Sequence, residues 1–280
     1  MELIRPFDPW GDELCTCTGK LSLNPYTGCS HRCIYCYITS YIPRAFECRP
    51  KKELARRVAR EASKLGSTPV SMCNSSDPYP HTEKRLMLTR KCLEIFKEHE
   101  IPVLIVTKSD IVLRDADLLR KMDCVVSFTV TSLRPQIYKK LEPNAPPPEK
   151  RLDALRKLAR EIPCTVRIDP IIPFVNDSDI EKVVEAASSC GAAHITSSTF
   201  KPRPDSWRRV ASAFPHREMR KLYEQGERRK NYQYLPQGER RKLMEKVRDA
   251  CKDYGVTFGA CREGLNINTG KSCDGGHLLR

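Results

Sequence analysis

One stretch of the chain reads Asn24-Pro-Tyr-Thr-Gly-Cys-Ser-His-Arg-Cys-Ile-Tyr-Cys-Tyr37. It sets Cys29, Cys33 and Cys36 in a C-x-x-x-C-x-x-C spacing on one short loop. Three thiolates on such a loop can bind three irons of a cubane iron–sulfur cluster, and the fourth iron then has no protein ligand. A small molecule can bind that iron and accept an electron. The stretch therefore predicts a redox-active metal centre with one open position.

A structural zinc site is the alternative interpretation of the three cysteines, because cysteine clusters in intracellular proteins often bind zinc. Structural zinc usually takes four ligands in two pairs, and no matching Cys-x-x-Cys follows shortly after this one. A short strand at Lys20–Asn24 runs directly into the loop. This setting favours the iron–sulfur cluster over zinc.

Length and composition limit the class of protein. A chain of 280 residues can bury one good core, which predicts one main domain. The mean hydropathy is −0.51, and no apolar run approaches the roughly 20 residues of a membrane span. The first residues lack the pattern of a secretory signal. We therefore expect a cytoplasmic protein without a membrane segment, whose fourteen cysteines serve metal clusters and ordinary packing rather than disulfides.

The positive charge of the chain is unevenly distributed. The net charge is +14, and the segment from Lys201 to Lys252 holds sixteen Lys and Arg against seven Asp and Glu. Such a basic segment favours a polyanionic partner, with tRNA or DNA as the expected substrates. Its aromatic residues Trp207, Tyr223, Tyr232 and Tyr234 suit base stacking. A solvated basic helix face is the alternative.

Strand-like and helix-like segments alternate along the first two hundred residues. Apolar runs typical of buried parallel strands are Lys20–Leu23, Pro69–Asn74, Val103–Lys108, Cys124–Thr131, Thr165–Ile172 and His194–Phe200. Helical patterns lie between them, which predicts βα units with right-handed crossovers in an α/β fold. Such a sheet curls toward a barrel and binds its ligands at the carboxyl ends of its strands.

The cysteine loop and the alternating pattern together resemble the radical S-adenosylmethionine (SAM) superfamily. This resemblance implies a partial (β/α)6 barrel of TIM type, a 4Fe-4S cluster on Cys29, Cys33 and Cys36, and SAM chelated to the open iron. It also implies reductive cleavage of SAM to a 5′-deoxyadenosyl radical, and a place for Tyr35 near the adenine. We divide the chain into an N-terminal segment 1–18, the barrel 19–200 and a basic, mainly helical extension 201–280. In this extension we expect a turn at Lys201–Trp207 and helices near Arg217–Lys230 and Gln237–Tyr254.

The stretch Met72-Cys-Asn-Ser-Ser-Asp-Pro-Tyr-Pro-His-Thr-Glu83 is similar to the T-D-P-Y-Q-P-x-E signature of one branch of that superfamily, which includes spore photoproduct lyase and "DNA repair photolyase" relatives. The resemblance implies that Ser75, Ser76 and Asp77 receive the methionyl ammonium of SAM, and that Lys108 faces its carboxylate. The superfamily's usual Gly-Gly-Glu is absent. Asp77-Pro78 also suits a turn or a helix N-cap.

Polar residues within two later strands are further candidates to bind SAM. Ser127 and Thr129 alternate with apolar residues and would face the barrel interior, near the ribose or the methionyl group, although the β-propensity of threonine also explains the alternation. Arg167 and Asp169 are charged residues inside an apolar strand, where burial is costly unless the charges are paired or used. We expect them to pair with each other or to contact SAM.

The remaining cysteines with a distinctive position lie near the chain ends and after the second strand. Cys15 and Cys17 precede the first strand, whereas Cys261 and Cys273 lie in the tail. These four thiols predict a second iron–sulfur cluster or a zinc site. Packed thiols are the alternative. Cys73 lies where the resemblance implies a hydrogen-donating catalytic cysteine, and here too plain packing is the alternative.

Three functions are consistent with these features. The first is a radical SAM enzyme, of a lyase-like branch, that modifies or repairs a nucleic acid. The second is a radical SAM enzyme that modifies a protein side chain or a small molecule with the help of an auxiliary cluster. The third is a zinc-binding module on nucleic acid without enzymatic activity. Either enzyme would need an electron donor such as ferredoxin or flavodoxin, and the sequence carries no signal for the oligomeric state.

Overall fold

The structure is a computed structural model that describes residues 2–7, 13–72 and 75–280. Its main strands are β1 (Arg5–Pro6), β2 (Leu21–Leu23), β5 (Val70–Met72), β6 (Val103–Thr107), β7 (Cys124–Thr129), β8 (Cys164–Ile171), β9 (His194–Thr199) and β12 (Thr257–Ala260). They form one sheet in the order β1-β2-β5-β6-β7-β8-β9-β12. Every pairing from β2 to β12 is parallel, and β1 pairs with β2 in the antiparallel sense. The strands expected from the apolar runs are therefore confirmed.

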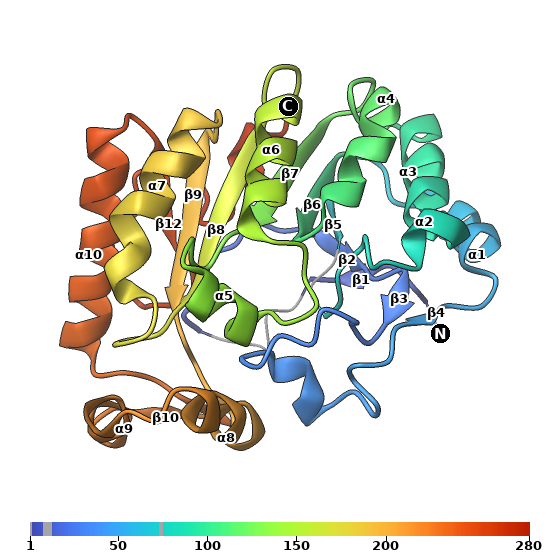
Figure 1. The fold of residues 1–280 in the computed structure, drawn as a ribbon. Coiled ribbons are helices and arrows are strands. Elements are labelled where there is room, and N and C mark those ends of the chain that lie inside the picture. The colour runs from blue at the N-terminus through green and yellow to red at the C-terminus, as the bar shows by residue number, and fades with distance from the viewer. Residues whose placement is uncertain (1, 8–12, 73–74) are drawn as a thin grey trace.

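Helices cover the outer face of this sheet (Figure 1). Those that connect its strands are α1 (Leu54–Ala62), α2 (Glu83–Leu86), α3 (Leu88–Glu98), α4 (Ala116–Leu119), α5 (Pro135–Leu141), α6 (Pro148–Leu158), α7 (Ile180–Ser189) and α10 (Gln237–Asp253). In α1, Leu54, Val58 and Ala62 recur at every fourth position and are buried, so this face packs inward. The mixed α/β class with a mostly parallel sheet agrees with the expectation.

The segment after Phe200 differs in detail from the sequence prediction. A turn was expected from Lys201 to Trp207, but α8 (Pro204–Ala213) begins within it, because proline is tolerated in the first turn of a helix. The helix expected at 217–230 ends earlier, as α9 (Arg217–Glu224). It is followed by the hairpin of β10 (Arg228–Arg229) and β11 (Tyr232–Gln233).

The end of this segment joins the main sheet. Strand β12 pairs with β9 in parallel, and α10 packs against α7, β9 and β12. The extension therefore supplies a further parallel strand and a covering helix, in addition to α8 and α9. The boundary after residue 200 stays a prediction.

The C-terminal tail runs back across the amino ends of the strands, opposite to the cysteine loop (Figure 1). Asp274 forms a buried ion pair with Lys20, directly before β2. The backbone amide of Arg280 lies 3.0 Å from a carboxylate oxygen of Asp123, directly before β7. In the described part of the chain, no helix combines the length and the apolar character that crossing a bilayer requires.

Candidate active site at the carboxyl ends of the strands

A cavity of about 500 Å³ extends from the carboxyl ends of the strands, where the cysteine loop lies, to Lys20 directly before β2. The three cysteines Cys29, Cys33 and Cys36 line it together. So do Arg5, from one edge of the sheet, and Cys261, directly after the strand at the other edge. Residues from both edges of the sheet can line one cavity only if the sheet curves, as a partial barrel does.

The cysteine loop is closed by a small ribbon of β3 (Tyr26–Thr27) and β4 (Arg49–Pro50). Gly28 has a φ of +75°, and a Cβ there would lie 2.3 Å from the carbonyl oxygen of Glu47. The amide of Cys29 donates to the carbonyl of Ala45 at 2.8 Å. Only glycine permits this close approach, so the ribbon fixes where the first cysteine enters the cavity.

Arg209 on α8 holds the other end of the cysteine loop. Its Nε donates to the carbonyl of Ile34 at 2.9 Å, and its Nη2 donates to the carbonyl of Cys36 at 2.7 Å. The amide of Ile34 donates to the carbonyl of Leu141 at the end of α5. Sequence reasoning missed Arg209 because no local pattern connects residues more than 170 positions apart.

The three thiols of the loop are shielded from water. Burial is the main cause that raises the pKa of Cys29, of Cys36 and of Cys33, the last to about 12. Thiols in such a place ionise only when a cation compensates their charge, as a metal does. Within residues 2–7, 13–72 and 75–280, no three His, Cys, Asp or Glu side chains are arranged closely enough to coordinate a metal ion. The donor type, the shared loop and the shared cavity nevertheless fit a cluster with three cysteine ligands.

Tyr35 lines the cavity and belongs to a buried polar network. Its hydroxyl donates to Oε1 of Glu142 at 2.5 Å, and Glu142 forms an ion pair with Arg151, whose side chain is fully buried. The ammonium of Lys108 lies 5.6 Å from the centre of the Tyr35 ring. Burial would lower the pKa of Lys108, but Cys33 and Glu142 raise it, so its positive charge persists in the cavity.

Asp77 connects the ends of neighbouring strands. One carboxylate oxygen accepts from the amide of Tyr79 at 2.9 Å and from the hydroxyl of Thr107 at 2.7 Å. The other accepts from the amide of Lys108 at 2.7 Å and lies 3.5 Å from Nδ1 of His31. These contacts agree with the turn that the sequence suggested for Asp77-Pro78. Asp77 also lines the cavity, and its contact with SAM stays a prediction.

The hydroxyl candidates divide into two groups. Ser75, Ser76 and Thr129 line the cavity. Ser127 does not line it, and its hydroxyl is buried without a hydrogen-bond partner in the part of the chain that the structure covers. Cys73, the predicted hydrogen donor, lies outside the described residues.

Arg167 and Asp169 form the ion pair that the sequence suggested. Nη2 of Arg167 lies 2.7 Å from Oδ2 of Asp169, and both side chains line the cavity. Ser198 donates to the other carboxylate oxygen of Asp169 at 3.1 Å. Next to them Lys201 pairs with the buried Glu263 at 2.6 Å, an interaction that sequence reasoning missed.

The four cysteines from the two chain ends meet at the side of the cavity. The sulfurs of Cys17 and Cys273 are 3.6 Å apart, and the amide of Cys17 donates to the sulfur of Cys15 at 3.4 Å. The Cys261 thiol is hydrogen-bonded to Cys273 and to Arg167. Cys17 and Cys261 also line the cavity, so this second thiol group borders the first.

The cavity wall carries more positive than negative charge. Six basic side chains line it, namely those of Arg5, Lys20, Lys108, Arg167, Lys201 and Arg262. Three acidic side chains line it, and each is engaged: Asp77 by hydrogen bonds, Asp169 by Arg167 and Asp274 by Lys20. Lys201 is likewise paired, with Glu263 beside the cavity. The charged groups together still leave a net positive charge, which favours an anionic ligand.

Sequence comparisons agree with this arrangement. Residues 23–187 match the sequence model of the Radical SAM superfamily. An uncharacterized protein of Methanocaldococcus jannaschii, MJ0683, is 34% identical over 173 residues, in a match that covers 56% of this chain and 62% of that protein. The uncharacterized protein Rv2578c of Mycobacterium tuberculosis is 24% identical over 253 residues, in a match that covers 81% of this chain and 72% of that protein. The match to the first of these relatives thus spans about three fifths of its length.

Solved structures share the fold. Spore photoproduct lyase complexed with dinucleoside spore photoproduct superposes with a TM-score of 0.65 at 16% identity, over 88% of this chain and 75% of that one. Streptococcus suis SuiB bound to the precursor peptide SuiA gives a TM-score of 0.60 at 15% identity, over 86% and 48% of the two chains. These likenesses show the fold, and the sequence match covers the cysteine loop and most of the barrel. The chain belongs to the radical SAM superfamily.

Proposed function

We propose that this protein is an enzyme that cleaves SAM reductively at a 4Fe-4S cluster and uses the resulting 5′-deoxyadenosyl radical to modify or repair a nucleic acid. The observation that carries the proposal is the cavity that three cysteines of one loop line together and whose charged side chains are mainly basic. The superfamily implies the cluster and SAM, and these supply the radical chemistry. The residues of the chain bind and orient the reactants and exclude water.

The proposed roles follow from the positions of the side chains. Cys29, Cys33 and Cys36 would hold the cluster, and Lys108 presents a positive charge to an anionic group such as the carboxylate of SAM. The Tyr35 ring offers an apolar face beside them, because its hydroxyl is occupied by Glu142. Arg167 and Asp169 present hydrogen-bonding groups from β8. Ser75, Ser76, Thr129 and the hydrogen-donor role of Cys73 complete the proposed site.

A nucleic acid is the proposed substrate because phosphates would be attracted to the basic cavity wall. The fold neighbour spore photoproduct lyase was solved with a dinucleoside photoproduct. Base stacking by tyrosines of the basic segment, as their sequence suggested, is not supported. Tyr223 and Tyr234 are 3% and 0% exposed, and Tyr223 donates to the carbonyl of Phe200 in the interior.

We further propose that the enzyme is cytoplasmic and receives its electrons from a ferredoxin or a flavodoxin.

We also propose a second metal centre on Cys15, Cys17, Cys261 and Cys273. The proposal is supported by the contacts among these thiols, of which Cys17 and Cys273 are 256 positions apart in the sequence. Four thiols suit either an iron–sulfur cluster or zinc.

A radical SAM enzyme that modifies a peptide or a small molecule is the second candidate function, favoured by this thiol group beside the cavity. The fold neighbour SuiB was solved with a precursor peptide.

The proposed reaction is tested with anaerobically reconstituted protein, SAM and a strong reductant. We expect 5′-deoxyadenosine to form, and its amount to rise when total tRNA or ultraviolet-irradiated DNA is added. A Cys33→Ala variant should form none, whereas Cys92→Ala, which changes a buried thiol on α3, should retain the activity. No 5′-deoxyadenosine from fully loaded protein would refute the reaction. Product formation that responds to peptides but not to nucleic acids would favour the second candidate.

The second metal centre is tested by metal analysis. Reconstituted protein should hold about eight irons if both centres are 4Fe-4S clusters, or about four irons and one zinc if the second is a zinc site. A double variant Cys17→Ala, Cys273→Ala should lose the second metal and keep about four irons. Cys48→Ala, outside both thiol groups, serves as the control. About four irons and no zinc in the unaltered protein would exclude the second centre.

A further inference from the structure

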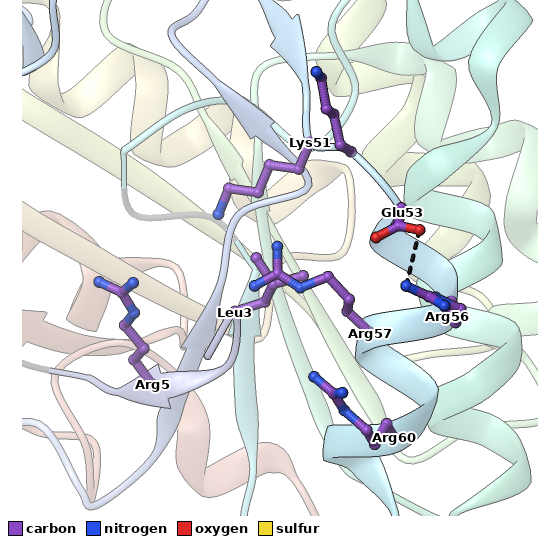
Figure 2. A pocket seen from close by; sticks show the side chains of 8 residues that line it. Leu3, Arg5, Lys51, Glu53, Arg56, Arg57 and Arg60 are labelled. Carbon is purple, nitrogen blue, oxygen red and sulfur yellow. Dashed lines mark ion pairs between the residues drawn. The ribbon is translucent and has the colours of Figure 1, made fainter. Parts of the chain in front are cut away.

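A second hollow, of about 720 Å³, lies between the edge strand β1 and helix α1 (Figure 2). Glu53 is the one acidic residue among those that line it. Six basic residues line it: Arg5, Lys51, Lys52, Arg56, Arg57 and Arg60. The hollow is therefore more strongly basic than the cavity that holds the three cysteines.

The periodicity of α1 produces this charge. Arg60 follows Arg57 by three positions and Arg56 by four, so its side chain neighbours both on the helix surface, while the apolar residues of α1 pack inward. Figure 2 shows Arg57 and Arg60 extending into the space beside Leu3. Like charges at this spacing repel each other, and an anion between them would relieve the repulsion. Glu53 pairs with Arg56 at 2.8 Å, but both side chains are mostly exposed and such pairs contribute little.

The two walls of the hollow are fixed against each other. Oε2 of Glu61 on α1 accepts hydrogen bonds from the amides of Leu3 and Ile4, each at 2.8 Å. Leu3, the apolar residue among those that line the hollow, is itself buried. The backbone that carries the basic side chains of the hollow is therefore held in place by these hydrogen bonds.

Arg5 connects the hollow to the active-site cavity, because it lines both. A chain of phosphates that crosses the hollow can thus continue to the mouth of the cavity. The guanidinium group binds phosphate oxygens through two parallel hydrogen bonds, which suits the arginines of this surface. Leu3 is the one apolar side chain among the lining residues, so a peptide would find few pockets for its own side chains.

We propose that the hollow between β1 and α1 binds the phosphodiester backbone of the nucleic acid whose target nucleotide enters the cavity. This inference rests on the proposed function and names the surface that positions its substrate. It differs from the sequence expectation, which assigned the polyanion to the segment 201–252. In that segment Arg240 is 2% exposed and bound to Glu227, and Arg209 is bound to the cysteine loop. Helices α1 and α10 lie on opposite sides of the molecule (Figure 1).

Two triple variants that lose the same charge test this proposal. The hollow variant is Arg56→Gln, Arg57→Gln, Arg60→Gln, and the control on α10 is Arg241→Gln, Lys242→Gln, Lys246→Gln. Arg5 is left unchanged because it lines the cavity. Binding of cluster-loaded protein to a fluorescein-labelled DNA duplex and to labelled tRNA is followed by anisotropy at several salt concentrations. The hollow variant should bind at least about tenfold more weakly, with a salt slope smaller by about two to three, and the control should change by about twofold or less.

Several outcomes would overturn the proposal. The unaltered protein would bind neither nucleic acid, or the two triple variants would lose affinity equally. Inorganic phosphate at the concentration of the DNA phosphates would displace the DNA, or labelled polyglutamate would bind as tightly as the DNA does.

Formation of 5′-deoxyadenosine from SAM alone is measured on the same samples and should be equal in all three proteins. If the unaltered protein forms none, the proposed function fails. If it forms 5′-deoxyadenosine and the hollow variant binds nucleic acid normally, only the hollow is refuted.

Discussion

At the scale of single residues, the site depends on side chains that hold the cysteine loop from a distance. Arg209 donates hydrogen bonds to the carbonyls of Ile34 and Cys36, the two residues that flank Tyr35 in the cysteine loop. It also forms an ion pair with Asp205 at 3.1 Å. Burial would raise the pKa of Asp205, but hydrogen bonds from Thr39, Ser40 and Arg209 lower it to about 2, so this carboxylate stays ionised. Arg209 is therefore a positioning residue for the cluster loop.

The first prediction concerns Arg209. Replacing it by glutamine removes charge-assisted hydrogen bonds to two carbonyls, which are typically worth about 1.5–3 kcal/mol each. We expect the Arg209→Gln protein to retain less iron after reconstitution and to unfold at a lower temperature. Arg208→Gln, which changes an exposed neighbour on the same helix, is the control and should behave like the unaltered protein. Equal iron content in both variants would contradict the positioning role.

The second prediction concerns His194 at the start of β9. Its ring is fully buried, with Nδ1 2.9 Å from the hydroxyl of Thr257, and burial lowers its pKa to about 4. The folded protein therefore favours the neutral ring, so this contribution to stability is present above the usual pKa of 6.5 and is lost as the pH falls toward 4. From pH 7 to pH 5 the cost is about 2 kcal/mol.

Urea unfolding of metal-free protein at the two pH values checks this expectation. In a His194→Gln variant the difference between the two free energies of unfolding should be smaller by about 2 kcal/mol. An unchanged difference would show that the ring is protonated equally well in the folded and the unfolded protein.

At the scale of elements, the regular parts of the barrel were predictable and the loops that complete the site were not. The strands Val103–Thr107 and Cys124–Thr129 carry their own signal, because parallel strands that are buried on both faces are mostly apolar along their length. Strand β1 and the ribbon of β3 and β4 are two residues long per strand, too short for any periodicity. Their positions depend on contacts with distant parts of the chain, such as Glu61.

The third prediction concerns the ribbon of β3 and β4. Gly28→Ala would place a methyl group against the carbonyls of Ala45 and Glu47, at a φ that favours glycine. We expect a destabilisation of about 2–3 kcal/mol and poor iron incorporation, since the ribbon fixes Cys29. Gly19→Ala, where a Cβ meets no atom within 4 Å, is the control. Normal iron content in Gly28→Ala would refute the role given to the ribbon.

At the scale of the whole molecule, the segment before β2 and the C-terminal tail contact each other. The tail reaches the start of β2 through Asp274 and Lys20, and it brings Cys273 to Cys17. The sequence suggested that these two pairs of cysteines come together, because four thiols can form a second metal site only if they lie close in space. The pairing of β12 with β9 was not foreseen, since a four-residue strand after a long helical region does not reveal its neighbour.

The fourth prediction concerns the buried ion pair of Lys20 and Asp274. Removing one partner of such a pair leaves the other charge buried and typically costs about 3–5 kcal/mol. We expect Asp274→Asn to unfold at a lower urea concentration and to lose metal from the second thiol group before the first. Asp123→Asn, which changes an exposed contact of the same tail, is the control. A stability equal to that of the control would show that the tail does not depend on this pair.

Electron paramagnetic resonance tests the central claim most directly, namely that Cys29, Cys33 and Cys36 hold a cluster with an open iron. Anaerobically reconstituted protein is reduced and measured with and without SAM. The account predicts the signal of a reduced 4Fe-4S cluster whose shape changes when SAM is added, and the loss of that change in Cys33→Ala. A cluster signal that ignores SAM, or a site filled only by four-coordinate zinc, would contradict it.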